Sequence, residues 1–203
     1  MKRGELDGYK EFITEEEAQQ WAEKIYAYQC SDEFKSRQDF TDLFCYGGNM
    51  YRPINRFLRN NEKISQDTKL LVEKLRKIVL STTLTENVVV YRSVKYSCFK
   101  NLCGENKISR GVRFCDKAFL STSLSKNCAM KFHKNKGNDC MLKLYLTAGI
   151  HAIYLSYTDT ISALHEQELL LEPEVEFEII KVKGIRQKVI ECKMVSGENY
   201  EFL

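Results

Sequence analysis

The sequence has few prolines and glycines, 2 and 10 among 203 residues. Disordered and fibrous chains are rich in these residues, so the composition argues against both classes. No apolar run approaches the roughly 20 residues that a membrane-spanning helix requires. Residues 1–12 begin with basic side chains but contain no apolar core, so we expect no signal peptide. The length suits one domain that is large enough to bury a core.

Metal-binding patterns are scarce as well. The chain has three histidines, His133, His151 and His165, and no C-x-x-C pair, so we expect neither a zinc site nor another metal site. Eight cysteines are present, but a chain of this length does not need disulfides to fold. Cys140 and Cys192 lie in apolar, strand-like runs, and we predict that both are buried thiols.

The net charge is small, +3, and does not by itself indicate nucleic-acid binding. Residues 1–80 carry 14 basic and 14 acidic side chains, whereas residues 92–143 carry 12 basic and 3 acidic ones. Residues 159–178 carry seven acidic side chains and neither Lys nor Arg. This order predicts a site where an anion lies beside carboxylates, although solvated faces of neighbouring strands would show the same pattern.

Residues 1–80 have the pattern of helices. Four segments carry apolar side chains at helical spacing. We expect three of the helices to begin at a Ser or Thr cap, namely Thr14 (followed by Glu17 in a capping box), Ser31 and Ser65. A short helix is expected around residues 53–59, and Gly47-Gly48 is expected to end the helix before it.

After Thr85 the pattern changes to that of β-strands. Seven segments are β-branched or alternate in polarity: residues 87–92, 118–125, 140–146, 151–155, 166–173, 175–183 and 188–195. Their connections are short or loop-like, with no strong helix between the last four, which favours antiparallel pairing. We therefore predict one α+β domain over residues 1–203, with a helical part (1–80) and a β-rich core (86–196) that is a twisted sheet or a pair of sheets.

Glu166-Gln167-Glu168 is the sharpest candidate for a catalytic site. In a strand, side chains two residues apart project to one face, about 6.6 Å apart. Two carboxylates on one face repel each other, which raises the pKa of one and suits acid–base chemistry or the stabilisation of a developing cation. An exposed polar face of a strand has the same spacing.

Ser121-Thr122-Ser123 interrupts an apolar segment with three hydroxyls. Ser121 and Ser123 share one face of the expected strand, and Thr122 points to the other. Buried hydroxyls need hydrogen-bond partners, so these residues either orient a ligand or a carboxylate, or are satisfied within the strands.

Arg92 and two polar side chains of the third helix are candidates for binding an anion. Arg92 ends the first apolar strand, where its guanidinium can hold a phosphate or a carboxylate through two hydrogen bonds. Asn55 and Arg59 lie one helical turn apart and face the same way. A surface arginine and an ordinary amphipathic helix are the alternatives.

Taken together and in this order, the motifs resemble those of the Arg–Ser–Glu class of bacterial mono-ADP-ribosyltransferases, which includes exoenzymes and the enzymatic components of binary toxins. The family's aromatic-Arg, S-T-S and E-x-E motifs are matched by Tyr91-Arg92, Ser121–Ser123 and Glu166–Glu168, and its Y-x-x-I-N-x-x-L-R helix by Tyr51–Arg59. The resemblance covers about residues 10–195 and implies N-terminal helices packed on a mainly antiparallel, two-sheet β-core.

The resemblance implies cleavage of the nicotinamide–ribose bond of NAD and transfer of ADP-ribose to an acceptor, without a metal. Glu168 would stabilise the oxocarbenium-like ribose through its 2′-hydroxyl, Ser121 would hold that carboxylate, and Arg92 would bind the diphosphate. Ser93 follows where the family commonly has glycine. Further NAD contacts are implied for Asn55, Arg59, Ser93, Thr122, Ser123 and Phe132, the last in the segment after S-T-S where the family has a phosphate–nicotinamide loop.

Glu166 would act on the acceptor. In this family a Glu at this position goes with arginine acceptors, and a carboxylate can pair with a guanidinium and assist its deprotonation. Tyr157 and Leu164, in the loop 156–164, would contact the acceptor. The implied enzyme is a protein-arginine ADP-ribosyltransferase.

The implied biological role is that of a toxin or effector, secreted or injected and acting in the cytoplasm of a target cell, with a protein acceptor and a delivery or antidote partner. Three alternatives stay open: an intracellular toxin that modifies a nucleic acid, a non-catalytic binding module of the same fold, and a glycoside or nucleoside hydrolase. The hydrolase also needs two carboxylates, but it provides no reason for Arg92 and S-T-S to accompany them.

Overall fold

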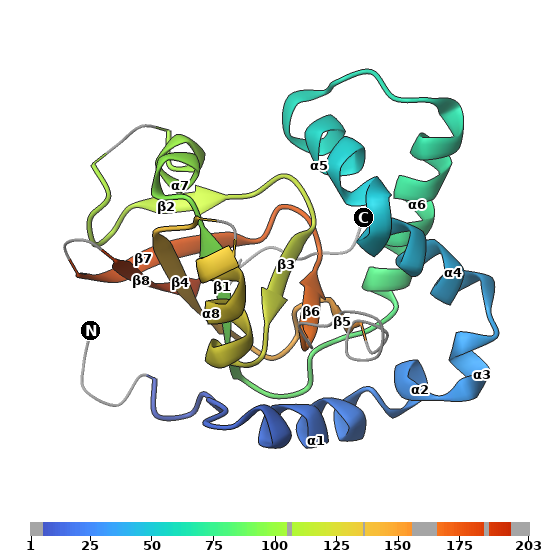
Figure 1. Ribbon diagram of the computed structural model, residues 1–203, viewed down its shortest axis with the longest axis horizontal. Coiled ribbons are helices and arrows are strands. Elements are labelled where there is room, and N and C mark those ends of the chain that lie inside the picture. The colour runs from blue at the N-terminus through green and yellow to red at the C-terminus, as the bar shows by residue number, and fades with distance from the viewer. Residues whose placement is uncertain (1–5, 105–106, 136, 156–165, 185–186, 196–203) are drawn as a thin grey trace.

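The α+β architecture is confirmed by the computed structural model shown in Figure 1. The structure describes residues 6–104, 107–135, 137–155, 166–184 and 187–195. Helices fill most of the N-terminal part, and they lie beside a β-sheet that is formed by the later segments (Figure 1).

Three of the N-terminal helices begin where the sequence predicts caps. Their bounds are α1 (Glu15–Ile25), α2 (Ala27–Cys30), α3 (Asp32–Lys35), α4 (Gln38–Cys45), the π-helix η1 (Tyr46–Met50), α5 (Tyr51–Asn60) and α6 (Gln66–Leu80). Thr14 and Glu17 form the predicted capping box at the start of α1. The hydroxyls of Ser31 and Ser65 accept hydrogen bonds from backbone amides of α3 and α6, so all three predicted caps are confirmed.

Gly47 and Gly48 lie inside the π-helix η1, which joins α4 to α5, so the prediction that they end a helix is wrong. Glycine lowers the stability of a helix by about 1 kcal/mol, but it remains compatible with helical backbone. The buried side chains of Tyr46 and Ile54 anchor the chain on either side of the two glycines. The predicted second helix is instead divided between α3 and α4, at residues 36–37.

The strands form one eight-stranded sheet in the order β2-β7-β8-β4-β1-β3-β6-β5. Their bounds are β1 (Val88–Val94), β2 (Arg113–Cys115), β3 (Leu120–Ser123), β4 (Cys140–Leu146), β5 (Ala152–Tyr154), β6 (Glu168–Leu171), β7 (Glu176–Lys183) and β8 (Lys188–Met194). Neighbouring strands are antiparallel except β4 and β8, which are parallel. Each of the seven predicted segments contains one strand. The remaining strand, β2, is not predicted from the sequence, because a strand of three residues is too short to show a periodic pattern.

The sheet is nearly divided between β1 and β3. These two strands pair at one position, Tyr91 with Ser123, whereas β1 and β4 pair along seven residues, from Val88 to Val94. The strands thus form one sheet rather than the two sheets that the resemblance implies, and this sheet has two halves, β2-β7-β8-β4-β1 and β3-β6-β5. Arg92 follows Tyr91 at the point where β1 and β3 separate.

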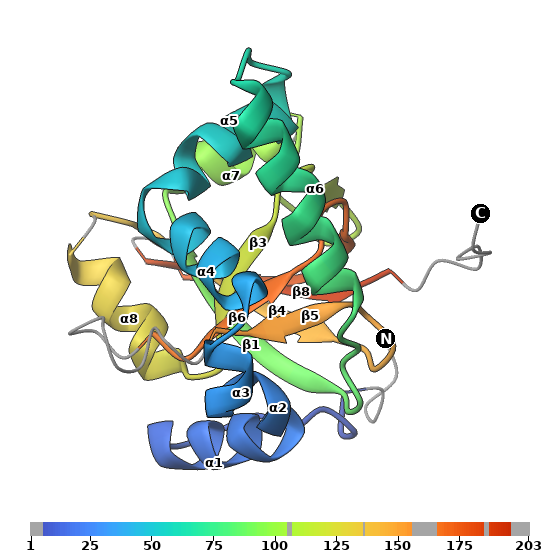
Figure 2. The same cartoon turned by 90° about the vertical axis from the view of Figure 1, so that its right-hand side faces the viewer.

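Two of the three hydrophobic clusters hold most of the helices on the sheet. The larger one joins Trp21 of α1 and Phe99 of α7 (Tyr96–Leu102) to buried strand residues such as Leu144. The second joins Ile54 of α5 to Leu170 of β6. Figure 2 shows the strands between α1 on one side and α5 and α6 on the other. The second cluster therefore fixes α5 over the strand that carries the E-x-E motif.

Two helices of the C-terminal part, α7 and α8 (Lys126–Asn135), differ from the expected loops. Helix α8 occupies the segment after S-T-S, for which the resemblance implies a phosphate–nicotinamide loop. Cys140 and Cys192 are fully buried, as predicted. All eight cysteines are free thiols. Within the described ranges, no helix has both the length and the apolar character that spanning a membrane would need.

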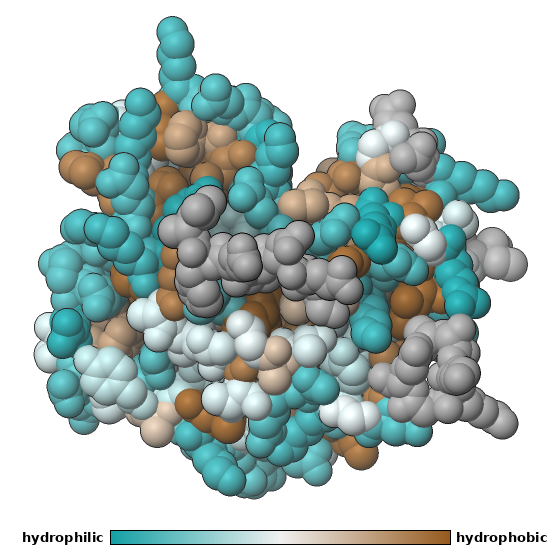
Figure 3. Space-filling model, turned by 180° about the vertical axis from the view of Figure 1, so that it is seen from behind, coloured by the Kyte–Doolittle hydropathy of each residue, from teal (hydrophilic) through white to brown (hydrophobic). Residues whose placement is uncertain are grey.

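Hydrophilic side chains cover most of the face seen in Figure 3, and apolar side chains appear in patches between them. The large apolar side chains that are exposed include Ile13, Tyr28, Phe44, Leu70, Leu80 and Val182. Individual exposed apolar residues are ordinary on folded domains, so these residues do not by themselves define a binding face.

Candidate active site

A cavity of about 390 Å³ opens where β1 and β3 separate. Residues of η1, α5, β1, β3 and α8 line it, together with Asn138 and the two glutamates of the E-x-E turn. The predicted site residues among them are Asn55, Arg92, Ser93, Ser121, Thr122, Ser123, Glu166 and Glu168. The three strand motifs and Asn55 of the helix motif, which are far apart in the sequence, therefore meet at one cavity.

Glu166 and Glu168 reach this cavity through a turn rather than along a straight strand. β6 begins at Glu168, and Gln167 has a φ of 45°, in the left-handed region. The spacing of about 6.6 Å expected for a regular strand therefore does not apply. Glu168 is buried, at 7% relative exposure, whereas Glu166 is partly exposed. The deeper carboxylate is the one for which the resemblance implies contact with the ribose.

The S-T-S motif forms most of β3 and anchors the E-x-E turn. Ser123 lies opposite Glu168 in the β3–β6 ladder, so both serines share a face of the sheet with Glu168, and Thr122 points to the other. The Ser123 hydroxyl donates to the Glu166 carbonyl at 2.8 Å. The Thr122 hydroxyl donates to the Leu169 carbonyl at 2.7 Å. These hydroxyls therefore hold the backbone on both sides of Glu168.

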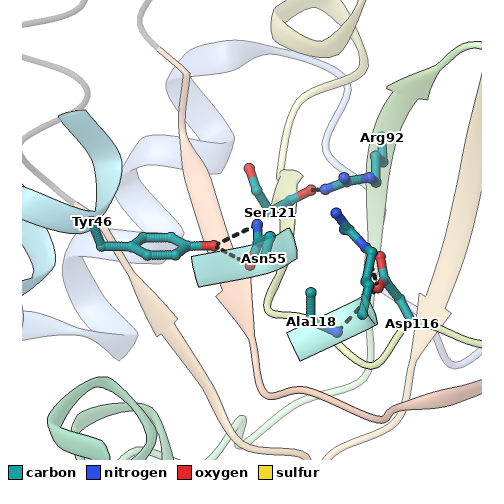
Figure 4. Close-up of polar contacts among 7 residues, drawn as sticks. Tyr46, Asn55, Arg92, Asp116, Ala118 and Ser121 are labelled. Carbon is teal, nitrogen blue, oxygen red and sulfur yellow. Dashed lines mark hydrogen bonds and ion pairs between the residues drawn. The ribbon is translucent and has the colours of Figure 1, made fainter. Parts of the chain in front are cut away.

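Arg92 spans the gap between the two halves of the sheet. Its Nη1 atom donates a hydrogen bond to the Ser121 carbonyl at 2.5 Å, as Figure 4 shows. Burial lowers the pKa of Arg92 and the negative charge of Asp116 opposes this shift; an arginine nevertheless stays protonated in proteins. The cavity therefore contains a fixed cation together with the two carboxylates.

Asn55 is held by Tyr46. The Asn55 amide donates to the Tyr46 hydroxyl at 3.2 Å, and the hydroxyl donates to Asn55 Oδ1 at 3.4 Å (Figure 4). Burial raises the pKa of Tyr46, so the hydroxyl stays protonated. Tyr46, Gly47 and Gly48 line the cavity from η1, a kind of turn that is frequent at functional sites. Sequence reasoning missed them because a glycine pair also signals the end of a helix.

Arg59 lies outside the set of residues that line the cavity, and its guanidinium is bound by Asp116. Its Nε and Nη2 atoms donate to the two carboxylate oxygens at 2.8 and 2.7 Å, a bidentate ion pair. This bond raises the pKa of Arg59. Asp116 is buried and also accepts a hydrogen bond from the Ala118 amide at 3.1 Å (Figure 4). A single Asp within a basic segment carries no recognisable pattern, so sequence reasoning missed it.

Asp116→Asn is expected to lower the stability of the fold, because it removes the charged partner of Arg59. Breaking a fully buried pair costs about 3–5 kcal/mol. The Arg59 side chain is 35% exposed, so we expect roughly 1–2 kcal/mol. The melting temperature would fall by roughly 2–4 °C per kcal/mol for a domain of this size. The double variant Asp116→Asn/Arg59→Gln should recover part of the loss, and additive losses in thermal unfolding would contradict the pairing.

Three predicted site residues lie beyond what the structure describes. Tyr157 and Leu164, predicted to contact the acceptor, fall outside the described residues. Phe132, predicted to contact NAD, belongs to α8, but its side chain is not described. Asn138, which sequence reasoning missed, lines the cavity and donates to the Ser93 hydroxyl at 3.1 Å. A lone Asn between a helix and a strand gives no sequence signal.

The cavity can bind an anion and stabilise positive charge next to it. The guanidinium of Arg92 attracts phosphate, and the amide of Asn55 adds a neutral hydrogen-bonding group. The carboxylates of Glu166 and Glu168 can stabilise a cation that develops during a reaction. Across the described ranges, no group of three or more His, Cys, Asp or Glu residues is placed to hold a metal ion.

Comparison with known proteins gives one family. The family model described as ADP-ribosyltransferase exoenzyme matches residues 14–199. No curated protein matches the chain in sequence.

Solved structures share the fold at low sequence identity. Plx2a, an ADP-ribosyltransferase toxin from Paenibacillus larvae, has a TM-score of 0.70 at 20% identity, with 89% of this chain and 96% of that chain covered. C3stau2 from S. aureus, solved with NAD, has a TM-score of 0.74 at 19% identity, covering 94% and 100%. BECa, an ADP-ribosylating toxin of a binary enterotoxin of C. perfringens solved with NADH, has a TM-score of 0.73 at 20% identity, covering 92% of this chain and 50% of that chain.

Proposed function

Because the chain belongs to the ADP-ribosyltransferase exoenzyme family, we propose that this NAD-dependent mono-ADP-ribosyltransferase modifies an arginine side chain of a protein. The observation that supports this acceptor is the pair of carboxylates, Glu166 and Glu168, in one cavity with Arg92. In this proposal Glu168 serves the cleavage of NAD, and Glu166 serves the transfer to the acceptor.

The first step breaks the bond between nicotinamide and ribose. The bonding electron pair leaves with nicotinamide, and the ribose carbon develops oxocarbenium-like charge. The Glu168 carboxylate accepts a hydrogen bond from the ribose 2′-hydroxyl and stabilises that charge more in the transition state than in the ground state. Ser121 shares the face of the sheet that Glu168 occupies and supports its side chain.

Arg92 binds the diphosphate of NAD, with Asn55 at the adenylate end. Arg59 is proposed for the same end, where it would have to share its guanidinium with Asp116. A guanidinium has five N–H groups, so the bond from Arg92 to the Ser121 carbonyl is compatible with binding a phosphate as well. Further contacts with NAD are proposed for Ser93, Thr122, Ser123 and Phe132.

The second step forms a bond between the ribose carbon and a nitrogen of the acceptor guanidinium. The guanidinium is protonated at neutral pH and loses one proton as the new C–N bond forms. Glu166 pairs with the guanidinium and takes up that proton. Glutamine could pair but could not accept the proton, so a Glu at this position favours arginine. Tyr157 and Leu164 contact the acceptor in this proposal.

A nucleic acid is the second candidate acceptor. Residues 92–143 carry 12 basic and 3 acidic side chains, which would attract a polyanion. The basic segment also contains Arg92, however, and part of its charge therefore serves the diphosphate of NAD.

Labelled NAD distinguishes these acceptors. Labelled NAD and the protein are incubated in three parallel reactions. The first contains a small guanidine such as agmatine, the second a protein lysate, and the third the nucleic acids of the same cells. We expect label on agmatine and on arginine residues, which mass spectrometry maps. Label on asparagine or on nucleic acid, with none on arginine, would overturn the arginine acceptor.

We also propose that the enzyme is a toxin or effector, secreted or injected, which acts in the cytoplasm of a target cell with a delivery or antidote partner. Two findings support this: the matching family is one of exoenzymes, and Plx2a and BECa, which share the fold, are toxins. Action inside the producing cell is the alternative.

Arg92→Ala is expected to weaken NAD binding by about 10- to 100-fold, because a hydrogen bond to a charged group contributes about 1.5–3 kcal/mol. Calorimetric titration with NAD measures the dissociation constant. Arg92→Lys keeps the charge without the planar fork and should give an intermediate value. Thermal unfolding is recorded alongside, because Arg92 also bonds the Ser121 carbonyl. An unchanged dissociation constant would remove Arg92 from the NAD site.

A further inference from the structure

Gln167 separates the two carboxylates of the cavity and is itself buried, at 2% relative exposure. It is not among the residues that line the cavity. Its φ of 45° lies in a region that few residues other than glycine and asparagine adopt. The turn at Gln167 brings Glu166 to the cavity that Glu168 lines. The conformation of Gln167 therefore decides how the two carboxylates are placed relative to each other.

The side-chain amide of Gln167 is held by hydrogen bonds at both its nitrogen and its oxygen. Its Nε2 atom donates to the carbonyl of Glu15, the first residue of α1, at 2.5 Å. Its Oε1 atom accepts a hydrogen bond from the Cys128 thiol of α8 at 3.7 Å. The main-chain carbonyl of Gln167 accepts from the Leu124 amide at 3.1 Å. Two helices and the end of β3 thus fix this one residue.

The elements that receive this amide are tied to each other. Lys131 of α8 forms an ion pair with the Glu15 carboxylate at 3.1 Å. The Thr14 capping box holds the first turn of α1. Phe12, just before α1, forms a β-bridge with Ser125, just before α8. The position of the Gln167 amide is therefore set by residues that do not line the cavity.

Glu168 and Glu166 depend on this anchor to different degrees. Glu168 belongs to β6, pairs with Ser123, and its carbonyl accepts from the Leu155 amide at 2.9 Å. Glu166 precedes the strand, and the Ser123 hydroxyl holds its carbonyl. If the anchor is lost, the left-handed backbone at Gln167 can relax, because non-glycine residues keep this conformation where the surroundings impose it. Such a relaxation would move Glu166 more than Glu168.

We propose that Gln167 is a positioning residue that sets the Glu166 carboxylate for transfer to the acceptor. This inference rests on the roles proposed for Glu166 and Glu168. The amide of Gln167, bound to Glu15 and Cys128, keeps the turn left-handed. In this conformation Glu166 is placed for the acceptor while Glu168 is placed for the ribose. Loss of the amide should therefore reduce transfer more than it reduces NAD cleavage.

Gln167→Met tests the inference, because methionine keeps the length and the burial of the side chain but can form neither amide hydrogen bond. We expect kcat for transfer to fall about 10-fold or more, kcat for NAD hydrolysis to fall less than about 3-fold, and KM for NAD to stay within about 2-fold, since small displacements of a catalytic group reduce rates strongly. Gln20→Met, on the exposed surface of α1, is the matched control and should behave like the wild type.

Gln167→Asn is the conservative variant, and it carries the test if Gln167→Met does not fold. Asparagine adopts the left-handed region readily and keeps an amide, one methylene shorter, so its ratio of transfer to hydrolysis should lie between those of Gln167→Met and the wild type. Equal losses of both activities, or an unchanged ratio, would overturn the positioning role. Absence of arginine transfer by the wild type would instead overturn the proposed acceptor, and the ratio is then measured with the acceptor that labelled NAD identifies.

Discussion

Glu168→Gln is expected to lose about 10²-fold or more of both NAD hydrolysis and ADP-ribosyl transfer. The amide has the size and shape of the carboxylate but no charge with which to stabilise an oxocarbenium-like ribose. Because that charge exists mainly in the transition state, kcat should fall much more than the affinity for NAD. Steady-state rates with labelled NAD, with and without an acceptor, measure both activities.

The fold of this variant should be unchanged, because the β6 ladder uses the main chain of Glu168. Glu172, directly after the same strand, is the matched control. Its carboxylate accepts from the His151 amide at 3.2 Å, and burial raises its pKa, but it is not among the residues that line the cavity. Glu172→Gln should keep near-normal turnover in the same assays. Wild-type-like transfer by Glu168→Gln, with thermal unfolding unchanged, would refute the role of Glu168.

The helix caps and most strands could be predicted from the sequence because their signals are local. Each cap hydroxyl accepts a hydrogen bond from the backbone amide three residues later, at Thr14, Ser31 and Ser65. The cap and the start of its helix therefore lie within one short segment of the sequence. The pairing between strands is not local. β1 and β3 meet at the single pair Tyr91 and Ser123, and no pattern within either strand specifies whether the halves join into one sheet.

Glycine is a local signal with two meanings, and this explains the error at η1. Gly47-Gly48 either ends a helix or permits an unusual helical turn, and what decides is the burial of Tyr46 and Ile54 on either side. That burial depends on strands that follow much later in the chain, such as β6 through Leu170. The sequence near the glycines could not distinguish the two outcomes.

The motif residues of the cavity could be predicted because each places a polar group in an apolar context, as Arg92 does at the end of its strand. Asp116 and Gln167 could not, because their roles depend on distant partners. Asp116 binds Arg59, 57 residues away, and Gln167 binds Glu15, 152 residues away. The sequence therefore indicates which residues line the cavity more readily than which residues hold them in place.

Glu166→Gln is expected to reduce transfer to arginine by at least about 10²-fold, the scale of a lost general base, while NAD hydrolysis stays within about 3-fold of the wild type. Glutamine can still pair with the acceptor but cannot take its proton. The turn should survive, because the Ser123 hydroxyl holds the main-chain carbonyl of residue 166 and the Gln167 amide bonds Glu15 and Cys128.

The contrast between Glu166→Gln and Glu168→Gln is what separates the two steps. Glu168 is buried and Glu166 is partly exposed, so the deeper carboxylate can act on the ribose while the outer one meets a macromolecule. If the division holds, hydrolysis without acceptor distinguishes the variants at once, since Glu168→Gln loses it and Glu166→Gln keeps it. Equal loss of hydrolysis and transfer in Glu166→Gln would mean that both carboxylates serve NAD cleavage, and the choice of arginine would then have to come from residues other than Glu166.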